Sequence, residues 1–209
     1  MTILLGIETA TSACSVALRV STIADTQHYA RFQIAPREHT DLVLPMIDEV
    51  LREATISRTD IDAIAFGCGP GSFIGTRLAV SVAQGLGFAL NRPLIPISTL
   101  AVLAQTAYEQ YACTRVLAGW DARMSEIYWG VYEACNGLMC AVQADQLSAV
   151  EDIVARFLEY TCVGNVWDTG ITECYPRAES LLTLALAKFN AGDLVPALAA
   201  EPVYLRRAI

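Results

Sequence analysis

The amino-acid sequence predicts an α/β protein of two lobes, in which mixed β-sheets are covered by helices. Its first half reads as strands and helices in the order β-β-β-α-β-α-β-α, an antiparallel meander followed by parallel crossovers. Its second half repeats part of that order with fewer elements. The chain has 209 residues, 54% of them apolar, so it can bury a sizeable core. We therefore predict a first lobe over residues 1–112 and a shortened second lobe over residues 113–209.

The first third of the chain contains three strands and one helix. Residues 40–54 carry apolar side chains at the i, i+3, i+4, i+7 spacing of an amphipathic helix, with Thr40 or Asp41 as its N-cap. Pro45 requires that this helix start late or bend. The strands are predicted from short apolar runs or alternation over residues 3–7, 14–20 and 27–33.

The stretch over residues 69–90 is the one around which we expect the first lobe to be organised. A strand over residues 61–68 leads into a Gly-Pro-Gly-Ser sequence, which is typical of a tight turn. A helix follows from about residue 75 to residue 90, and Pro93 ends it. Its apolar side chains occupy all sides, so we expect the helix to be buried or covered by a partner.

The remaining elements complete the pattern. Pro96 predicts that a short strand over residues 94–97 lies at a sheet edge, and Ser98 is expected to cap the helix that follows to about Tyr111. The order of elements is the signature of the ribonuclease H-like lobes of the actin, Hsp70 and sugar-kinase architecture. In the second lobe we predict strands over residues 115–120, 126–134, 138–144 and 162–167, and helices over residues 150–160 and 177–189.

Charge and cysteine content limit the possible functions. The formal net charge is −8, so the chain alone is expected to bind tRNA or DNA poorly, because affinity for phosphates depends on positive charge. Seven cysteines without a C-x-x-C pair are typical of reduced thiols in the cytosol. We find no signal peptide and no apolar run long enough for a membrane span, so we expect a cytoplasmic protein without a membrane partner.

The polar turn after the first strand is a weak candidate for a nucleotide site. ATPases and kinases of the actin type have Asp and then Gly-Thr at this place, which handle metal and phosphate. This chain has Glu8, Thr9, Thr11 and Ser12, so the acid is one methylene longer and the glycine is missing. We favour a structural turn and keep a stand-alone ATP-dependent kinase or ATPase as an alternative. A P-loop is excluded, because Thr76 stands where its lysine belongs.

Hydrolytic chemistry finds little support in the sequence. The two histidines, His28 and His39, lack the His-x-x-x-His spacing with which a metallopeptidase can hold its metal, so we expect no metal site and keep that activity only as an alternative. Ser72 lies outside any G-x-S-x-G pattern, so we interpret it as a helix cap. We therefore predict no catalytic residue.

Two charged segments are candidates for contacts, and only the first is expected at the cleft between the lobes. Asp121 and Arg123 follow a predicted strand at the start of the second lobe, where they would form a lobe-bridging ion pair or contact a partner. Arg206 and Arg207 make a small basic spot that is weak evidence for a contact with tRNA.

Five segments resemble the bacterial TsaB (YeaZ) family, and the block GPGSFIGTRLAVSVAQG is the most specific of them. The resemblance implies a non-catalytic subunit that pairs with a catalytic paralogue, TsaD, and a small ATPase, TsaE. Together they add threonylcarbamoyl to the adenosine next to the anticodon of tRNAs reading codons that begin with A. ATP is then used by the complex and not bound by this chain alone, and tRNA is contacted indirectly. The matching segments are residues 3–18, 37–54, 69–90, 121–132 and 201–206.

The resemblance also implies that the two helices over residues 40–54 and 75–90 form the partner interface. Small residues recur every four positions along the second helix, so a partner helix could approach it closely. We expect the side carrying Ala79 and Ala83 to face outward, giving a homodimer alone and a heterodimer with the paralogue. The predicted interface residues are Val43, Ile47, Val50, Gly75, Ala79, Val80, Ala83 and Gly87.

Overall fold

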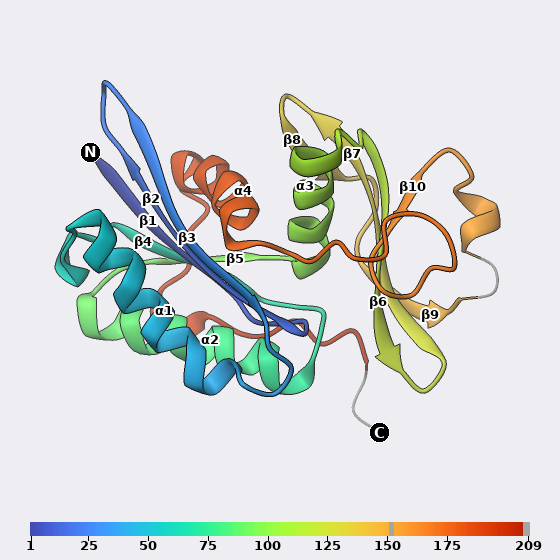
Figure 1. The fold of residues 1–209 in the computed structure, drawn as a ribbon, viewed down its shortest axis with the longest axis horizontal. Helices are drawn as coiled ribbons and strands as arrows, with labels where there is room; N and C mark the ends of the chain where they lie inside the picture. The colour runs from blue at the N-terminus through green and yellow to red at the C-terminus, as the bar shows by residue number, and fades with distance from the viewer. Residues whose placement is uncertain (151–152, 207–209) are drawn as a thin grey trace.

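The computed structural model describes residues 1–150 and 153–206, and it consists of two five-stranded sheets with helices around and between them (Figure 1). The mixed α/β fold with two lobes is as predicted. From one end of the molecule to the other, the layers are a pair of helices, the first sheet, a second layer of helices and the second sheet (Figure 1).

The first sheet has the strand order β3-β2-β1-β4-β5, with β1 in the middle. The first three strands form the predicted antiparallel meander, and β4 and β5 run parallel to β1 after helical crossovers. Pro96 lies in β5 at the edge of the sheet, a position where a residue without an N–H can be accommodated. The strands are β1 (Thr2–Glu8), β2 (Ala13–Ser21), β3 (Thr26–Ile34), β4 (Ala63–Gly67) and β5 (Leu94–Ile97).

Helices cover both faces of this sheet because β1 is apolar on both sides. Ile3, Leu5 and Ile7 share one core with α1 (His39–Ala54) and α2 (Phe73–Leu90). Leu4 points to the other face and packs in a core with α4 (Ala178–Ala191). The period of two along the strand thus divides its side chains between two helical layers.

The second sheet has the order β10-β6-β7-β8, and β9 also pairs with β7. One face packs on α3 (Thr99–Tyr111), and the outer face packs on aromatic residues of the loop that contains Phe157. The strands are β6 (Arg115–Arg123), β7 (Glu126–Cys135), β8 (Leu138–Ala141), β9 (Gln146–Ala149) and β10 (Thr161–Val163); short 3₁₀ helices span Arg58–Asp60, Val154–Arg156 and Ala197–Ala199.

The structure divides the chain differently from the predicted division at residue 112. Helix α4 packs on β1 and β2 of the first sheet, and residue Val195 pairs with Leu94 on β5. Further on, the N–H of Val203 donates to the carbonyl of Cys68 at 2.8 Å. The last part of the chain therefore returns to the first lobe, where α4 packs on the apolar sheet face opposite α1 and α2.

Several local predictions differ from the structure. Residues 153–160 form a single 3₁₀ turn and loops in place of the predicted helix, whose residues 151–152 lie outside the described part. Helix α1 starts at His39, its N-cap is Glu38 without a side-chain hydrogen bond, and Pro45 lies inside it at an exposed position. Strand β9 was not predicted. The helix over residues 75–90 starts slightly earlier than expected, and Ser72 caps it as predicted, with Oγ accepting from Gly75 N at 3.3 Å.

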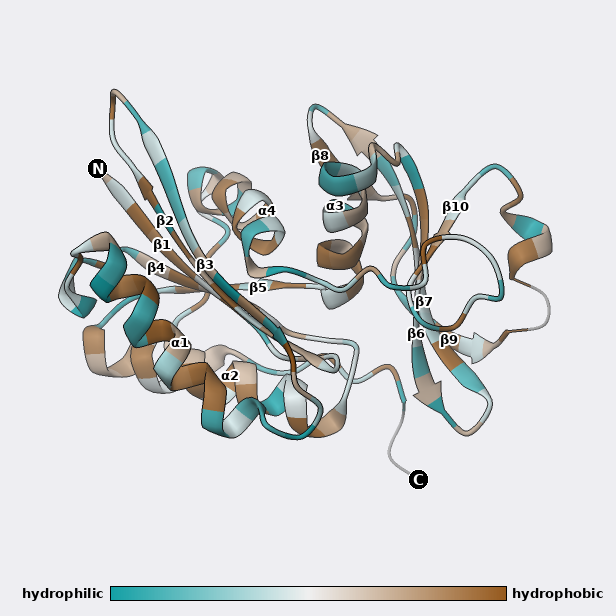
Figure 2. Cartoon of the chain, in the orientation of Figure 1, coloured by the Kyte–Doolittle hydropathy of each residue, from teal (hydrophilic) through white to brown (hydrophobic). Residues whose placement is uncertain are grey.

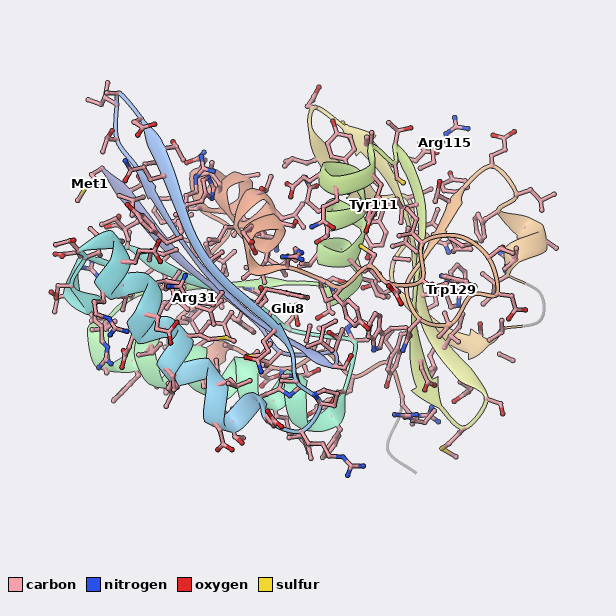
Figure 3. The ribbon with its side chains drawn as sticks, in the orientation of Figure 1. Met1, Glu8, Arg31, Tyr111, Arg115 and Trp129 are labelled. Carbon is pink, nitrogen blue, oxygen red and sulfur yellow. The ribbon has the colours of Figure 1, made fainter. Side chains whose placement is uncertain are left out.

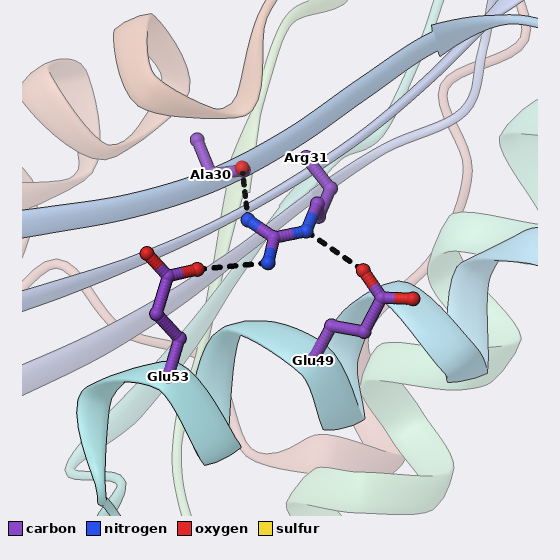
Figure 4. A network of polar contacts seen from close by, with 4 residues as sticks. All are labelled: Ala30, Arg31, Glu49 and Glu53. Carbon is purple, nitrogen blue, oxygen red and sulfur yellow. Dashed lines mark hydrogen bonds and ion pairs between the residues drawn. The ribbon is translucent and has the colours of Figure 1, made fainter.

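An arginine fork joins the outer helix to the sheet (Figure 4). Arg31 on β3 donates from Nε to Glu49 at 2.7 Å and from Nη2 to Glu53 at 2.8 Å. The two glutamates lie one turn from each other on α1. Its Nη1 donates to the carbonyl of Ala30 at 2.9 Å. All three groups are partly exposed, so this network orients α1 on the sheet more than it stabilises the fold.

Candidate functional sites

A cleft of about 1200 Å³ lies between the two lobes. It opens beyond the C-terminal end of β1, which is the usual place for ligands in sheets with parallel strands. Its walls come from six segments: the turn after β1, the loop before α1, the first turn of α2, the β6–β7 hairpin, the loop after β10 and the end of the chain. They contribute Thr11, Ser12, Arg37, His39, Phe73, Ile74, Arg77, Trp120, Asp121, Arg123, Tyr128, Asn165, Tyr204 and Arg206, among others.

The polar turn after β1, the weak candidate for a nucleotide site, is divided between the cleft and the interior. Thr11 and Ser12 line the cleft, but Glu8 and Thr9 have no exposed surface. Glu8 lies at the end of β1, toward the middle of the molecule (Figure 3). Its carboxylate accepts from Ala10 N at 2.7 Å and from Thr99 Oγ1 at 3.2 Å, so it joins β1 to the start of α3. Burial raises the pKa of Glu8 to about 7, against the opposite effect of these hydrogen bonds.

Thr9 has a structural role as well. Its Oγ1 donates to the carbonyl of Gly75 on α2 at 2.7 Å. A Cβ on Gly75 would lie 2.0 Å from the carbonyl oxygen of Thr9, and one on Gly67 would lie 1.9 Å from a Glu8 carboxylate oxygen. The glycines of this region therefore let β4 and α2 pack directly against the turn. Glu8 and Thr9, the two residues that most resemble catalytic groups, are therefore buried and hydrogen-bonded within the fold.

Asp121 and Arg123 both line the cleft, as predicted, but they do not bridge the lobes. Both belong to β6 of the second lobe, where Arg123 Nη1 lies 2.9 Å from Asp121 Oδ2. Asp121 also accepts from the N–H of Arg123 at 2.7 Å and donates its own N–H to Asn165 at 3.1 Å. The pair thus stabilises the hairpin from which it comes.

Arg206 contacts the second lobe from a segment that is anchored on the first, whereas the sequence indicated for it only weak evidence of a contact with tRNA. Its guanidinium pairs with Glu126 at 2.7 Å and donates to the carbonyl of Ala122 at 3.0 Å, both in the second lobe. Two residues earlier, Tyr204 accepts from Arg77 Nε on α2 at 2.7 Å. The segment from Val203 to Arg206 thus runs from the first lobe to the second along the cleft. The resemblance of residues 201–206 to a known family was the one sequence signal for it.

The eight predicted interface residues are all buried inside the protomer, so the predicted outward side of α2 was wrong. Ala79 and Ala83 are fully buried, and α2 uses its row of small residues to approach the sheet and not a partner. A Cβ on Gly87, for example, would lie 2.7 Å from Leu94 on β5. The same holds for α1, whose predicted residues face the core. The eight are Val43, Ile47, Val50, Gly75, Ala79, Val80, Ala83 and Gly87.

The opposite side of α2 is exposed and largely apolar. Its outward positions follow the helical period from Ile74, 72% exposed, through Ser81 and Gly85 to Phe88, 68% exposed. Leu44 of α1, 52% exposed, adds to the apolar character of this side, and apolar stretches mark both helices in Figure 2. We call Leu44, Phe73, Ile74, Leu78, Val82, Gly85 and Phe88 the outer helical face.

The outer helical face needs an explanation, because monomeric proteins rarely expose a large contiguous apolar patch. Helix α2 is also long and apolar enough to cross a membrane by length and composition alone, which is weak evidence, and a third of it is buried in the protein. An apolar helix that packs one side on its own sheet and exposes the other is typical of a protein–protein interface.

The two histidines and Ser72, the residues considered for hydrolytic chemistry, lie in separate surroundings. His28 on β3 lies beside Arg19, and His39 Nε2 lies 3.2 Å from the carbonyl of Ala13, so the two imidazoles belong to separate surroundings. Within residues 1–150 and 153–206, no three potential metal ligands come together. No histidine is hydrogen-bonded to Ser72, whose hydroxyl caps α2.

The chain is similar to known proteins over its whole length. The family model for TsaD, tRNA N6-adenosine threonylcarbamoyltransferase, matches residues 26–165. A tRNA threonylcarbamoyladenosine biosynthesis protein TsaB of Escherichia coli is 38% identical, with 99% of this chain and 95% of that protein covered. The corresponding protein of Haemophilus influenzae is 34% identical, with 99% and 94% covered. The solved structure of YeaZ from Pseudomonas aeruginosa superimposes with a TM-score of 0.87 at 38% identity, covering 98% of this chain and all of that one.

Proposed function

This chain belongs to the TsaB family and is a subunit for the biosynthesis of threonylcarbamoyladenosine in tRNA, and we propose that it acts there as a scaffold without an active site of its own. The observation that supports a scaffold most directly is the outer helical face, an apolar surface without a cover in the protomer. The potential catalytic groups Glu8 and Thr9, by contrast, are sealed inside and hydrogen-bonded to the fold.

In this proposal the outer helical face binds the catalytic paralogue of the TsaD type, and the small ATPase TsaE joins the assembly. Burying side chains such as Ile74 and Phe88 would remove apolar surface from water, at about 25 cal/mol for each Å². A second copy of this chain presents the same apolar face, so the protomer alone pairs with itself around a two-fold axis. The paralogue replaces that copy when it is present.

The proposal assigns ATP use to the assembly and no cofactor to this chain alone. An actin-type ATPase needs an acid at the end of its first strand that can reach metal and phosphate, and Glu8 has no exposed surface. With a net charge of −8 the chain contacts tRNA indirectly, through its partners. We place it in the cytoplasm. A stand-alone kinase and a metallopeptidase find no comparable support among the described residues.

Reconstitution tests the proposal. The chain is mixed with the TsaD and TsaE proteins of the same organism, tRNA, ATP, threonine-derived precursor and all other components needed, and modified adenosine is measured with each protein omitted in turn. We expect modification only when this chain is present together with its partners. Modification by this chain alone, or full modification without it, would contradict the scaffold function.

A further inference from the structure

The cleft between the lobes is positively charged, although the chain as a whole is acidic. Four arginines line it, Arg37, Arg77, Arg123 and Arg206, against the single carboxylate of Asp121. The whole chain has 14 basic and 22 acidic residues, a net charge of −8. A concentration of one sign of charge in a cleft attracts ligands of the other sign.

Two of these arginines are already neutralised within the protein. Arg123 pairs with Asp121 at 2.9 Å, and Arg206 pairs with Glu126 at 2.7 Å. Neither Arg37 nor Arg77 forms an ion pair with a carboxylate in the part of the chain that the structure describes. The charge available to a ligand is therefore that of these two guanidinium groups, one from the loop before α1 and one from α2.

Arg77 is held in place for binding. Its guanidinium carbon lies 3.3 Å from the centre of the Phe73 ring and 5.3 Å from that of Tyr204, so it is stacked between two aromatic rings. Its Nε donates to the Tyr204 hydroxyl at 2.7 Å, which leaves the two terminal nitrogens for other acceptors. A guanidinium that is already oriented loses less conformational entropy when it binds a carboxylate.

The cleft is continuous with the outer helical face. Phe73, Ile74 and Leu78 line the cleft and also belong to that face, so a protein that covers the helices reaches the mouth of the cleft. The outer helical face provides apolar contacts and the cleft provides positive charge, a combination that suits one partner with an apolar surface and an acidic segment next to it.

We propose, on the basis of the function proposed above, that the cleft receives an acidic segment of the partner subunit that covers the outer helical face, with carboxylates bound by Arg37 and Arg77. Two available guanidiniums match one or two carboxylates. A polyphosphate carries more negative charge than these two guanidiniums neutralise, whereas one or two carboxylates match them. Arginine binds carboxylates through two parallel hydrogen bonds, which also fixes the position of the segment.

The test measures binding of the TsaD-type paralogue of the same organism by calorimetry, at low and at high salt. The double variant Arg37→Gln/Arg77→Gln is compared with Arg52→Gln/Arg156→Gln, which removes the same charge from exposed positions outside the cleft. We expect the first pair to weaken binding about 10- to 100-fold and to reduce its salt dependence, and the second to change it by less than about twofold. Denaturation midpoints verify that both variants are folded.

The outcomes separate this inference from the proposed function. Normal binding by Arg37→Gln/Arg77→Gln, together with loss of binding on Gly85→Arg in the outer helical face, would overturn the acidic segment and leave the scaffold in place. Absence of binding by the unmodified chain would overturn both. ATP and tRNA are tested with the chain alone: a rise in melting temperature that disappears in Arg37→Gln/Arg77→Gln would show that the cleft binds phosphate and would also overturn the inference.

Discussion

Two arginine substitutions, two residues apart on α2, should have opposite effects on the protein. Ala83 has no exposed surface and packs in the core of the first sheet, so Ala83→Arg forces a long charged side chain into a filled interior. Gly85 faces outward, and a Cβ added there meets no atom within 4 Å. The helix, the introduced charge and the side-chain size are the same, so each substitution is the control for the other.

The expected magnitudes follow from burial. Overpacking of a core costs about 1–3 kcal/mol, and an unpaired buried charge costs about 3–5 kcal/mol, so Ala83→Arg should remove about 4–8 kcal/mol. That is a large fraction of the stability of a typical domain, about 5–15 kcal/mol. Gly85→Arg should instead stabilise the helix by up to about 1 kcal/mol, because glycine is a poor helix former.

Urea denaturation and light scattering measure the two effects. For a slope of about 2 kcal/mol per M, Ala83→Arg should lower the midpoint by about 2–4 M or prevent folding. Gly85→Arg should leave the midpoint unchanged or raise it by up to about 0.5 M. It should yield only monomers and should not bind the paralogue, because it places a charge in the middle of the outer helical face. A normally stable Ala83→Arg protomer would refute the orientation of α2. A Gly85→Arg protein that still associates would show that the interface lies elsewhere.

Three further predictions concern a buried carboxyl, the chain terminus and the thiols. Burial raises the pKa of Glu8 from 4.5 to about 7, so its neutral form favours the folded state below pH 4.5, and that contribution is lost as the pH rises to about 7. The unmodified protein should therefore lose about 3 kcal/mol of unfolding free energy over this pH range, and Glu8→Gln should not show this loss. Denaturation curves of both proteins measure the difference in unfolding free energy, and a difference that stays constant with pH would contradict the prediction. Arg206→Ala should cost about 1 kcal/mol and speed hydrogen exchange in the β6–β7 hairpin, since the ion pair with Glu126 is partly exposed; unchanged exchange would show that Arg206 does not join the lobes. A thiol reagent should modify Cys135 and Cys140 in the folded protein, and should reach Cys14, whose pKa burial raises to about 12, only after unfolding.

Much of the fold could be predicted from the sequence, because local patterns specify it. The opening meander, the parallel strands around the Gly-rich turn and the caps Ser72 and Ser98 depend on neighbours within a few residues. The predicted helix over residues 150–160 was wrong, although it was inferred from the same kind of apolar pattern as the helices that the structure contains. Its apolar residues Phe157 and Tyr160 cover the outer face of the second sheet from a loop, and a periodicity argument cannot distinguish that from a helical stripe.

The candidate site depended on contacts between distant residues. An all-round apolar helix such as α2 has no polar side to mark what is exposed, so its orientation is decided by how closely Gly75 and Gly87 approach the sheet. Similarly, Glu8 accepts a hydrogen bond from Thr99, which lies 91 residues later, and Arg206 forms an ion pair with Glu126 across 80 residues.

The sequence was therefore sufficient for the order of elements and for the family, whose motifs are local strings of residues. It was not sufficient for the inward side of α2, the return of α4 to the first sheet, or the pairing of the cleft arginines. Each of these depends on which surfaces meet after the chain has folded, and burial and charge pairing are properties of that packing and not of neighbouring residues.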